Sequence, residues 1–155
     1  MIIGFDVDGV IATAPLGLHN LLRKFQGLWN VILKSPMGAL VYRHFRFPDK
    51  DVKNLICSLH SKGHTIIIIT YALGDGQKKA VEWLKKNGVP FDKATAPKRG
   101  EKPLEFKCRA VAEENCDFFV EDQDILAQGI SEKLQRVQVI HYRSVEDLSA
   151  LKELS

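Results

Sequence analysis

The sequence predicts an α/β protein built around a five-stranded parallel sheet. Short apolar segments of strand length alternate with amphipathic segments of about ten residues, which is the pattern of parallel strands joined by crossover helices. Residues 64–70 contain four consecutive isoleucines, as expected of a strand that helices cover on both faces. The length of 155 residues corresponds to one domain. Together these observations indicate a Rossmann-like three-layer sandwich.

The predicted strands are short apolar segments bounded by glycine, proline or polar residues. The first is followed by Gly9, which suits a tight exit from the sheet. The strands are expected at residues 1–7, 64–70, 91–95, 117–120 and 137–141. Ligands of such sheets bind beyond the carboxyl ends of the strands, so the strand exits are where a site is expected.

The predicted helices carry apolar residues at spacings of three and four. Pro48 is expected to start the helix at 49–61, and Gly63 suits a left-handed C-cap at its end. Asn87 and Gly88 end the helix at 77–86. The helices are expected at residues 16–33, 38–45, 49–61, 77–86, 104–114, 125–134 and 145–151.

One insertion, at residues 13–50, interrupts the alternation of strands and helices. It holds six basic residues against the single acidic Asp49, a net charge of +5, whereas the rest of the chain holds 16 basic and 18 acidic residues. The whole net charge of +3 therefore arises in this segment. Such a surface is either a solvated face or one that attracts an anionic ligand. We expect a small helical insertion within a single domain, residues 1–155.

The composition argues against several other classes of protein. With 45% hydrophobic and 26% charged residues, the chain resembles neither a disordered protein nor a disulfide scaffold. Its longest stretch without charged residues, 9–22, falls short of the ~20 apolar residues that a bilayer span needs. Asp6 interrupts the first apolar segment, which argues against a secretory signal. Cys57, Cys108 and Cys116 lack CxxC spacing and are expected to be reduced thiols of a cytoplasmic protein.

Acidic residues follow two of the predicted strands. Asp6 and Asp8 end the first strand, and Glu121 and Asp122 end the fourth. If these strands are neighbours, three or four carboxylates gather in one pocket, where repulsion raises their pKa values unless a cation is bound. Mg²⁺ takes oxygen ligands and commonly uses one or two protein carboxylates, which leaves room for water and phosphate. The sequence therefore predicts a magnesium site, with solvated turns as the alternative.

Three segments resemble motifs of the haloacid dehalogenase (HAD) superfamily of phosphohydrolases. Residues 5–10, Phe-Asp-Val-Asp-Gly-Val, resemble its first motif, and residues 66–70, Ile-Ile-Ile-Ile-Thr, are similar to its second. Residues 119–122, Phe-Val-Glu-Asp, resemble the fourth. The motifs follow the family order along the whole chain. Residues 83–92, Trp-Leu-Lys-Lys-Asn-Gly-Val-Pro-Phe-Asp, further resemble the small nucleotidase-like branch.

The resemblance implies a phosphatase in which the basic insertion is a helical cap. Asp6 would be the nucleophile that forms an aspartyl-phosphate. Asp8 would be the general acid toward the leaving oxygen and then the general base toward water, and it would also contact the phosphate. Thr70 and the backbone amide of Tyr71 would donate hydrogen bonds to the phosphoryl oxygens. In the nucleotidase-like branch Ala-Arg often follows the threonine, whereas this chain has Tyr71 and Ala72, so no role of that arginine carries over.

The resemblance also implies the metal ligands. Asp6 and Asp122 would bind Mg²⁺ through their carboxylates, and Asp8 would bind it through its backbone carbonyl. Glu121 would act as a direct ligand or through water.

The third motif of the superfamily, a lysine, has three candidates here. Lys98, Lys102 and Lys107 lie between the third and fourth predicted strands. Lys102 precedes a proline, as in many members, but those members have a longer helix before the acidic strand. Lys107 fits the compact spacing of this chain better. We therefore expect Lys107 to be the catalytic lysine that also contacts the phosphate, with Lys102 next.

The substrate is expected to be a small phosphorylated molecule, with a nucleotide favoured. Aromatic residues accompany the basic residues of the insertion and could stack on a base, although packing is their commoner use. They are Phe25, Trp29, Tyr42, Phe45 and Phe47. The alternative function is a noncatalytic module that binds nucleic acid or an acidic partner, against which the intact Asp6, Asp8 and Asp122 argue. A receiver-like phosphorylation switch would need an aspartate after the third strand, where none is found. Neither nucleic acid nor a membrane is expected as a partner.

Overall fold

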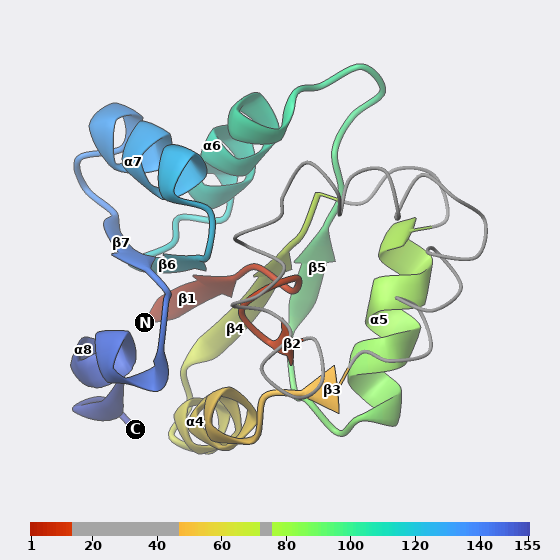
Figure 1. The fold of residues 1–155 in the computed structure, drawn as a ribbon, viewed down its shortest axis with the longest axis vertical. Helices are drawn as coiled ribbons and strands as arrows, with labels where there is room; N and C mark the ends of the chain where they lie inside the picture. Colours follow the sequence, from red (N-terminus) through yellow and green to blue (C-terminus); the bar gives the residue numbers. More distant parts are fainter. Residues whose placement is uncertain (14–46, 72–75) are drawn as a thin grey trace.

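A computed structural model describes residues 1–13, 47–71 and 76–155 of the chain. Its centre is a parallel five-stranded sheet with the order β5-β4-β1-β6-β7 (Figure 1). The strands are β1 (Ile2–Phe5), β4 (Thr65–Ile69), β5 (Lys93–Thr95), β6 (Phe118–Glu121) and β7 (Gln138–His141). The predicted parallel α/β sheet is thus confirmed. Winding reverses beside β1, which pairs with β4 on one side and β6 on the other.

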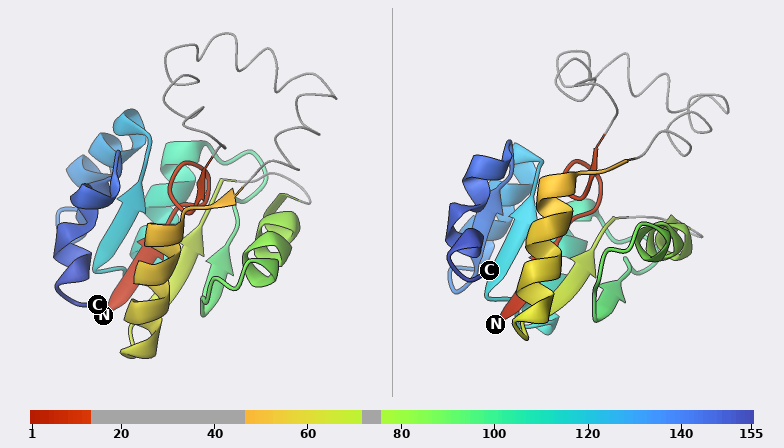
Figure 2. Two further views of the ribbon diagram at one scale, coloured as in Figure 1. Left: turned by 60° about the horizontal axis from the view of Figure 1, so that its bottom comes forward. Right: turned by 90° about the horizontal axis from the view of Figure 1, so that it is seen from below.

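Helices cover both faces of the sheet (Figures 1 and 2). Helices α6 (Pro103–Glu113) and α7 (Asp124–Lys133) lie on one face, and α4 (Lys50–Ser61) and α8 (Ser149–Lys152) lie on the other. Helix α5 (Gly76–Lys86) lies beside β5 and packs Leu84 into the same core as α4. No helix in these described ranges is long and apolar enough to span a membrane.

The isoleucine-rich strand β4 shows why the sheet is covered twice. Ile66 and Ile68 join the hydrophobic core under α4 and α8, whereas Ile67 and Ile69 join the core under α6 and α7. Successive side chains of a strand point to opposite faces, so an uninterrupted apolar strand needs a helical layer on each side.

Helix α4 begins one residue later than the sequence predicts. The Asp49 carboxylate caps it, because Oδ1 accepts hydrogen bonds from the backbone N–H groups of Asp51 (3.0 Å) and Val52 (3.1 Å). Pro48 was expected to start this helix but lies in a strand, so that prediction was wrong. At the other end Gly63 has a φ of +85°, the left-handed conformation expected of it.

A two-stranded ribbon at the ends of the insertion was not predicted. Strand β2 (Ala12–Thr13) pairs antiparallel with β3 (Phe47–Pro48), with Thr13 opposite Phe47. Two-residue strands carry no periodicity, which is why the sequence did not reveal them. The expected helices at 16–33 and 38–45 lie outside the described residues.

The C-terminal helix also differs from its prediction. The segment expected as one helix at 145–151 is a 3₁₀ turn, Val145–Leu148, followed by the short α8. Ser144 and Asp147 cap this turn, because the Asp147 carboxylate accepts a hydrogen bond from the Ser144 backbone N–H at 3.0 Å.

Candidate active site

The predicted site residues of three strands meet at the carboxyl edge of the sheet. Asp6 follows β1, Thr70 follows β4, and Glu121 ends β6 with Asp122 directly after it. The backbone N–H of Asp6 donates to the carbonyl of Val120 at 3.0 Å, which extends the pairing of β1 and β6 up to the acidic residues. Neighbouring parallel strands thus place side chains that are more than 100 positions apart in sequence beside one another.

Three carboxylates form a compact cluster at this edge. Asp6, Glu121 and Asp122 each offer an oxygen, and these oxygens lie within 4.8 Å of one another. The Oδ1 atom of Asp122 is buried and has no hydrogen-bond partner among the residues that the structure describes. A buried anionic oxygen without a partner is costly unless a cation binds it. The cluster therefore has the donor set and the unmet coordination that suit a divalent cation such as Mg²⁺.

Gly9 makes room for the Asp122 carboxylate. It has a φ of +88°, and a Cβ added there would lie 2.1 Å from Asp122 Oδ2. Glycine is thus required both by its conformation and by the close approach. A hydrogen bond from the Gly9 N–H to the Ala12 carbonyl, at 2.9 Å, closes the turn. Ala12 pairs there with Asp8, which is half-buried. Asp8 lies outside the carboxylate cluster, and its expected metal contact is through its backbone carbonyl.

Lys107 is the lysine that the fold brings to the acidic residues. Its side chain is 2% exposed, and Nζ donates hydrogen bonds to Asp6 Oδ2 at 2.9 Å and to Glu121 Oε2. The side chain of Lys98 is instead 70% exposed, and its Nζ lies 4.0 Å from Glu113 Oε1. Lys102 is exposed at the start of α6. Of the three candidates, only Lys107 contacts the carboxylate cluster within the described ranges.

The contact of Glu121 with Lys107 was missed by the sequence analysis, which considered Glu121 only as a metal ligand. Glu121 is fully buried, and its other oxygen, Oε1, accepts a hydrogen bond from the Gln123 backbone N–H at 3.1 Å. The available signal was the position of Lys107 on the apolar face of α6, beside Phe106 and Ala110. A lysine at such a position needs a buried acidic partner.

Thr70 and Tyr71 occupy the exit of β4. Thr70 is buried, and the Tyr71 side chain packs toward α6, with its hydroxyl donating to the Glu101 carbonyl at 2.8 Å and its ring 6.1 Å from that of Phe106. The side chain of Tyr71 therefore serves in packing. The predicted phosphate contact concerns its backbone amide.

Burial has the largest influence on the pKa values of the cluster. It raises the pKa of Asp6 from an ordinary 3.8 to about 7, although Lys107 acts in the opposite direction. Burial, with a contribution from Asp6, raises the pKa of Asp122 to about 6, and burial also raises the pKa of Glu121. For Lys107, burial lowers the pKa, but Asp6 and Glu121 outweigh this and hold it above its usual range. The cluster thus attracts protons or a cation.

These shifts predict that the metal-free protein loses stability as pH rises from about 4 to about 7. An acid whose pKa is higher in the folded than in the unfolded chain binds its proton more tightly when folded. Its contribution is therefore complete below 3.8 and is lost as pH passes about 6 for Asp122 and about 7 for Asp6. Urea unfolding in a chelator, at several pH values, measures this slope.

The Asp6→Asn variant is the control for this slope, because its amide does not titrate. Its stability should fall less steeply over the same range. Equal slopes for the two proteins would show that Asp6 does not titrate as described.

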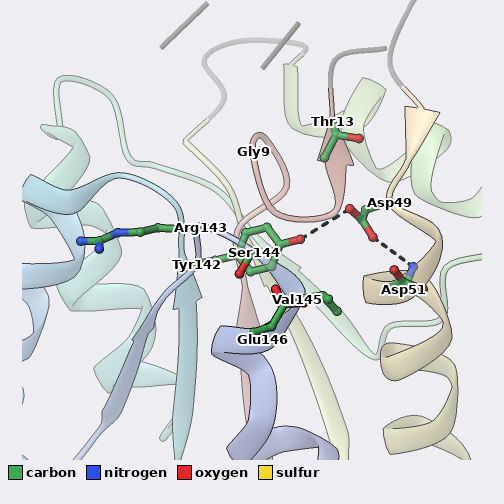
Figure 3. A pocket seen from close by; sticks show the side chains of 9 residues that line it. All are labelled: Gly9, Thr13, Asp49, Asp51, Tyr142, Arg143, Ser144, Val145 and Glu146. Atoms are coloured by element: carbon green, nitrogen blue, oxygen red, sulfur yellow. Dashed lines mark hydrogen bonds between the residues drawn. The ribbon is translucent and has the colours of Figure 1, made fainter. Parts of the chain in front are cut away.

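A separate cavity of about 270 Å³ adjoins the Gly9 turn (Figure 3). The Tyr142 hydroxyl points across it and donates to Asp49 Oδ2 at 3.5 Å, while Arg143 points away. The residues lining it are Gly9, Thr13, Asp49, Asp51, Tyr142, Arg143, Ser144, Val145 and Glu146. None of the predicted catalytic or metal-binding residues is among them, so this cavity is distinct from the carboxylate cluster.

Several solved structures of known proteins have an architecture similar to that of this chain. A haloacid dehalogenase-like hydrolase from Streptococcus pneumoniae superposes with a TM-score of 0.58 at 16% identity, over 97% of this chain and 90% of that one. The chain has the haloacid dehalogenase-like fold. A HAD-superfamily hydrolase from Ehrlichia chaffeensis is also similar, with a TM-score of 0.56 at 12% identity over 99% and 96% of the two chains. No family model and no curated protein matches the sequence.

A larger protein contains a region that is similar to this chain in structure. A chain of an RNA repair complex superposes with a TM-score of 0.64 at 13% identity over 91% of this chain. This chain spans only 42% of that protein's length.

Proposed function

We propose that the chain is a magnesium-dependent phosphomonoester hydrolase that acts through an aspartyl-phosphate. The observation that carries the proposal is the pairing of the buried Asp6 with Lys107, beside an Asp122 oxygen that lacks a partner. Ion pairs that serve only to stabilise the fold would explain why Lys107, Asp6 and Glu121 are buried together. They do not explain a third buried carboxylate with an unsatisfied oxygen, which a cation bound beside the nucleophile does explain.

Hydrolysis takes two displacements at phosphorus. In the first, a carboxylate oxygen of Asp6 forms a bond to phosphorus and the ester P–O bond breaks, while Asp8 gives its proton to the leaving oxygen. In the second, water attacks phosphorus as Asp8 takes a proton from it, and the bond from phosphorus to Asp6 breaks. Inorganic phosphate and the free carboxylate are the products.

Positive charge keeps Asp6 ionised and offsets the charge of the phosphoryl group. Lys107 supplies one such charge, because its ammonium group lies 2.9 Å from Asp6 Oδ2. Asp6 and Asp122, with the Asp8 carbonyl and Glu121 directly or through water, would hold Mg²⁺, which would neutralise charge on the transferred group. Thr70 and the Tyr71 amide would donate to the phosphoryl oxygens.

The proposed substrates are nucleotides and other small phosphorylated metabolites. The excess of basic residues between positions 13 and 50 favours a substrate with negative charge. Of the described ends of this segment, β2 directly follows the Gly9 turn and β3 precedes α4, and the Gly9 turn itself packs against Asp122.

A phosphate-release screen tests the proposed function. With Mg²⁺ present, the chain should release phosphate from an aryl phosphate ester, and a panel of nucleotides and sugar phosphates should identify faster substrates. A chelator should abolish the release, and added Mg²⁺ should restore it. Absence of release from every ester at saturating Mg²⁺ would contradict the proposal.

A further inference from the structure

The last residue of β7, His141, lies directly beside the acidic turn. It is opposite Glu121 in the strand register, and its Nε2 lies 3.1 Å from the backbone carbonyl oxygen of Asp122. A carbonyl can only accept, so Nε2 carries the proton and donates it. The next backbone N–H, that of Tyr142, donates to the Glu121 carbonyl at 2.8 Å. The end of β7 therefore holds the backbone of both acidic residues.

The other side of the His141 ring is also engaged. Its Nδ1 lies 3.2 Å from Asp124 Oδ1 and 3.1 Å from an Arg143 guanidinium nitrogen. His141 thus spans the turn from β6 into α7, because one ring nitrogen contacts residue 122 and the other faces residue 124. Contacts on both ring edges fix the orientation of the imidazole.

The Asp122 carboxylate depends on this turn for its position. Its Oδ1 makes no hydrogen bond within the described part of the chain, and Gly9 packs tightly against Oδ2. Among the described residues no hydrogen bond fixes Oδ1, so the direction of the side chain depends on where the backbone of residue 122 lies. The His141 hydrogen bond fixes that backbone from the side opposite to β1.

We propose that His141 is a positioning residue that holds Asp122 ready to bind the divalent cation. The inference rests on the proposed function for the identity of the cation, but it concerns binding and not turnover. Residues that orient metal ligands through hydrogen bonds typically change metal affinity by ~10- to 100-fold when they are replaced. The lower end applies here, because His141 acts on the backbone of a ligand and its side chain is 19% exposed.

Two substitutions at position 141 separate the hydrogen bond from ring packing. His141→Phe keeps a ring but cannot donate, and His141→Gln removes the ring but places an amide N–H at a similar reach. Titration calorimetry of the full chain with MgCl₂, without substrate, should show a roughly tenfold weaker affinity for the phenylalanine variant. The glutamine variant should stay within about twofold of wild type.

His60→Phe is the matched control, because His60 pairs with Asp92 at the far end of α4 and does not contact the acidic turn. Thermal unfolding of all four proteins identifies any variant whose fold has changed. The proposal is overturned if a folded His141→Phe binds Mg²⁺ as tightly as wild type, or if the glutamine variant loses as much affinity as the phenylalanine variant. It is also overturned if the wild type binds no Mg²⁺.

Failure of the proposed function looks different. Wild type would then bind Mg²⁺, and the phenylalanine variant would bind it more weakly, while no ester released phosphate. In that case the positioning role stands and the phosphatase assignment does not. If turnover is seen, the phenylalanine variant should need more Mg²⁺ than wild type for half-maximal rate. The difference in rate between the two proteins should shrink at saturating Mg²⁺.

Discussion

The Asp6→Asn variant is expected to lose phosphate release by a factor on the order of 10⁴ or more, because the catalytic nucleophile is removed. An amide is a far weaker nucleophile than a carboxylate and cannot form the aspartyl-phosphate. The substitution preserves the shape of the side chain, and the amide oxygen can still accept the hydrogen bond from Lys107. Steady-state release of phosphate from an aryl phosphate ester measures the effect.

The loss of phosphate release should arise from the missing nucleophile and not from a change in the fold. Removing a carboxylate from a crowded acidic cluster relieves repulsion, so the metal-free variant should be at least as stable as wild type at pH 8. Asp51→Asn is a matched control, because Asp51 is an exposed aspartate outside the carboxylate cluster. Turnover by Asp6→Asn comparable to that of Asp51→Asn would rule out Asp6 as the nucleophile.

The Lys107→Met variant is expected to be destabilised by about 3–5 kcal/mol, measured by denaturant unfolding at pH 8 in a chelator. Methionine fills most of the lysine volume but leaves Asp6 and Glu121 buried without a positive partner. Loss of one partner of a buried ion pair costs more than loss of both, because the remaining charge stays desolvated. Phosphate release should also fall sharply, since the ammonium group no longer offsets phosphoryl charge.

The pH dependence separates charge from packing. Without Lys107, the buried carboxyl groups can become neutral by taking up protons, so the loss of stability should be smaller at pH 5 than at pH 8. Lys98→Met and Lys102→Met are the matched controls, because both lysines are exposed and lie away from the cluster. Equal unfolding free energies for all three variants would contradict the ion-pair network.

The sequence predicts the sheet well because its strands are encoded locally. The isoleucines of β4 require helices on both faces, and the glycines at positions 63 and 88 mark helix ends through their left-handed conformations. The ribbon of β2 and β3 is different. Its pairing depends on where distant residues meet in space, and two residues carry no pattern that could reveal it.

In the candidate site, too, some features could be predicted from the sequence and others depend on contacts between distant residues. The meeting of Asp6 and Asp122 could be predicted, because carboxyl ends of neighbouring parallel strands share an edge. The choice of Lys107 was favoured by spacing, and its place on the apolar face of α6 explains why it is buried. The His141 contact could not be predicted, because it depends on a ring reaching across from β7 to one backbone carbonyl.

The ribbon brings Thr13 opposite Phe47, so both ends of the intervening segment are anchored at one place on the core. Closing a loop between fixed neighbouring ends depends only weakly on loop length. Segments of other lengths and sequences could therefore be exchanged between these anchors without moving β1 or α4. In the proposed enzyme, substrate preference would then evolve by replacement of this segment, while the phosphate chemistry is inherited unchanged.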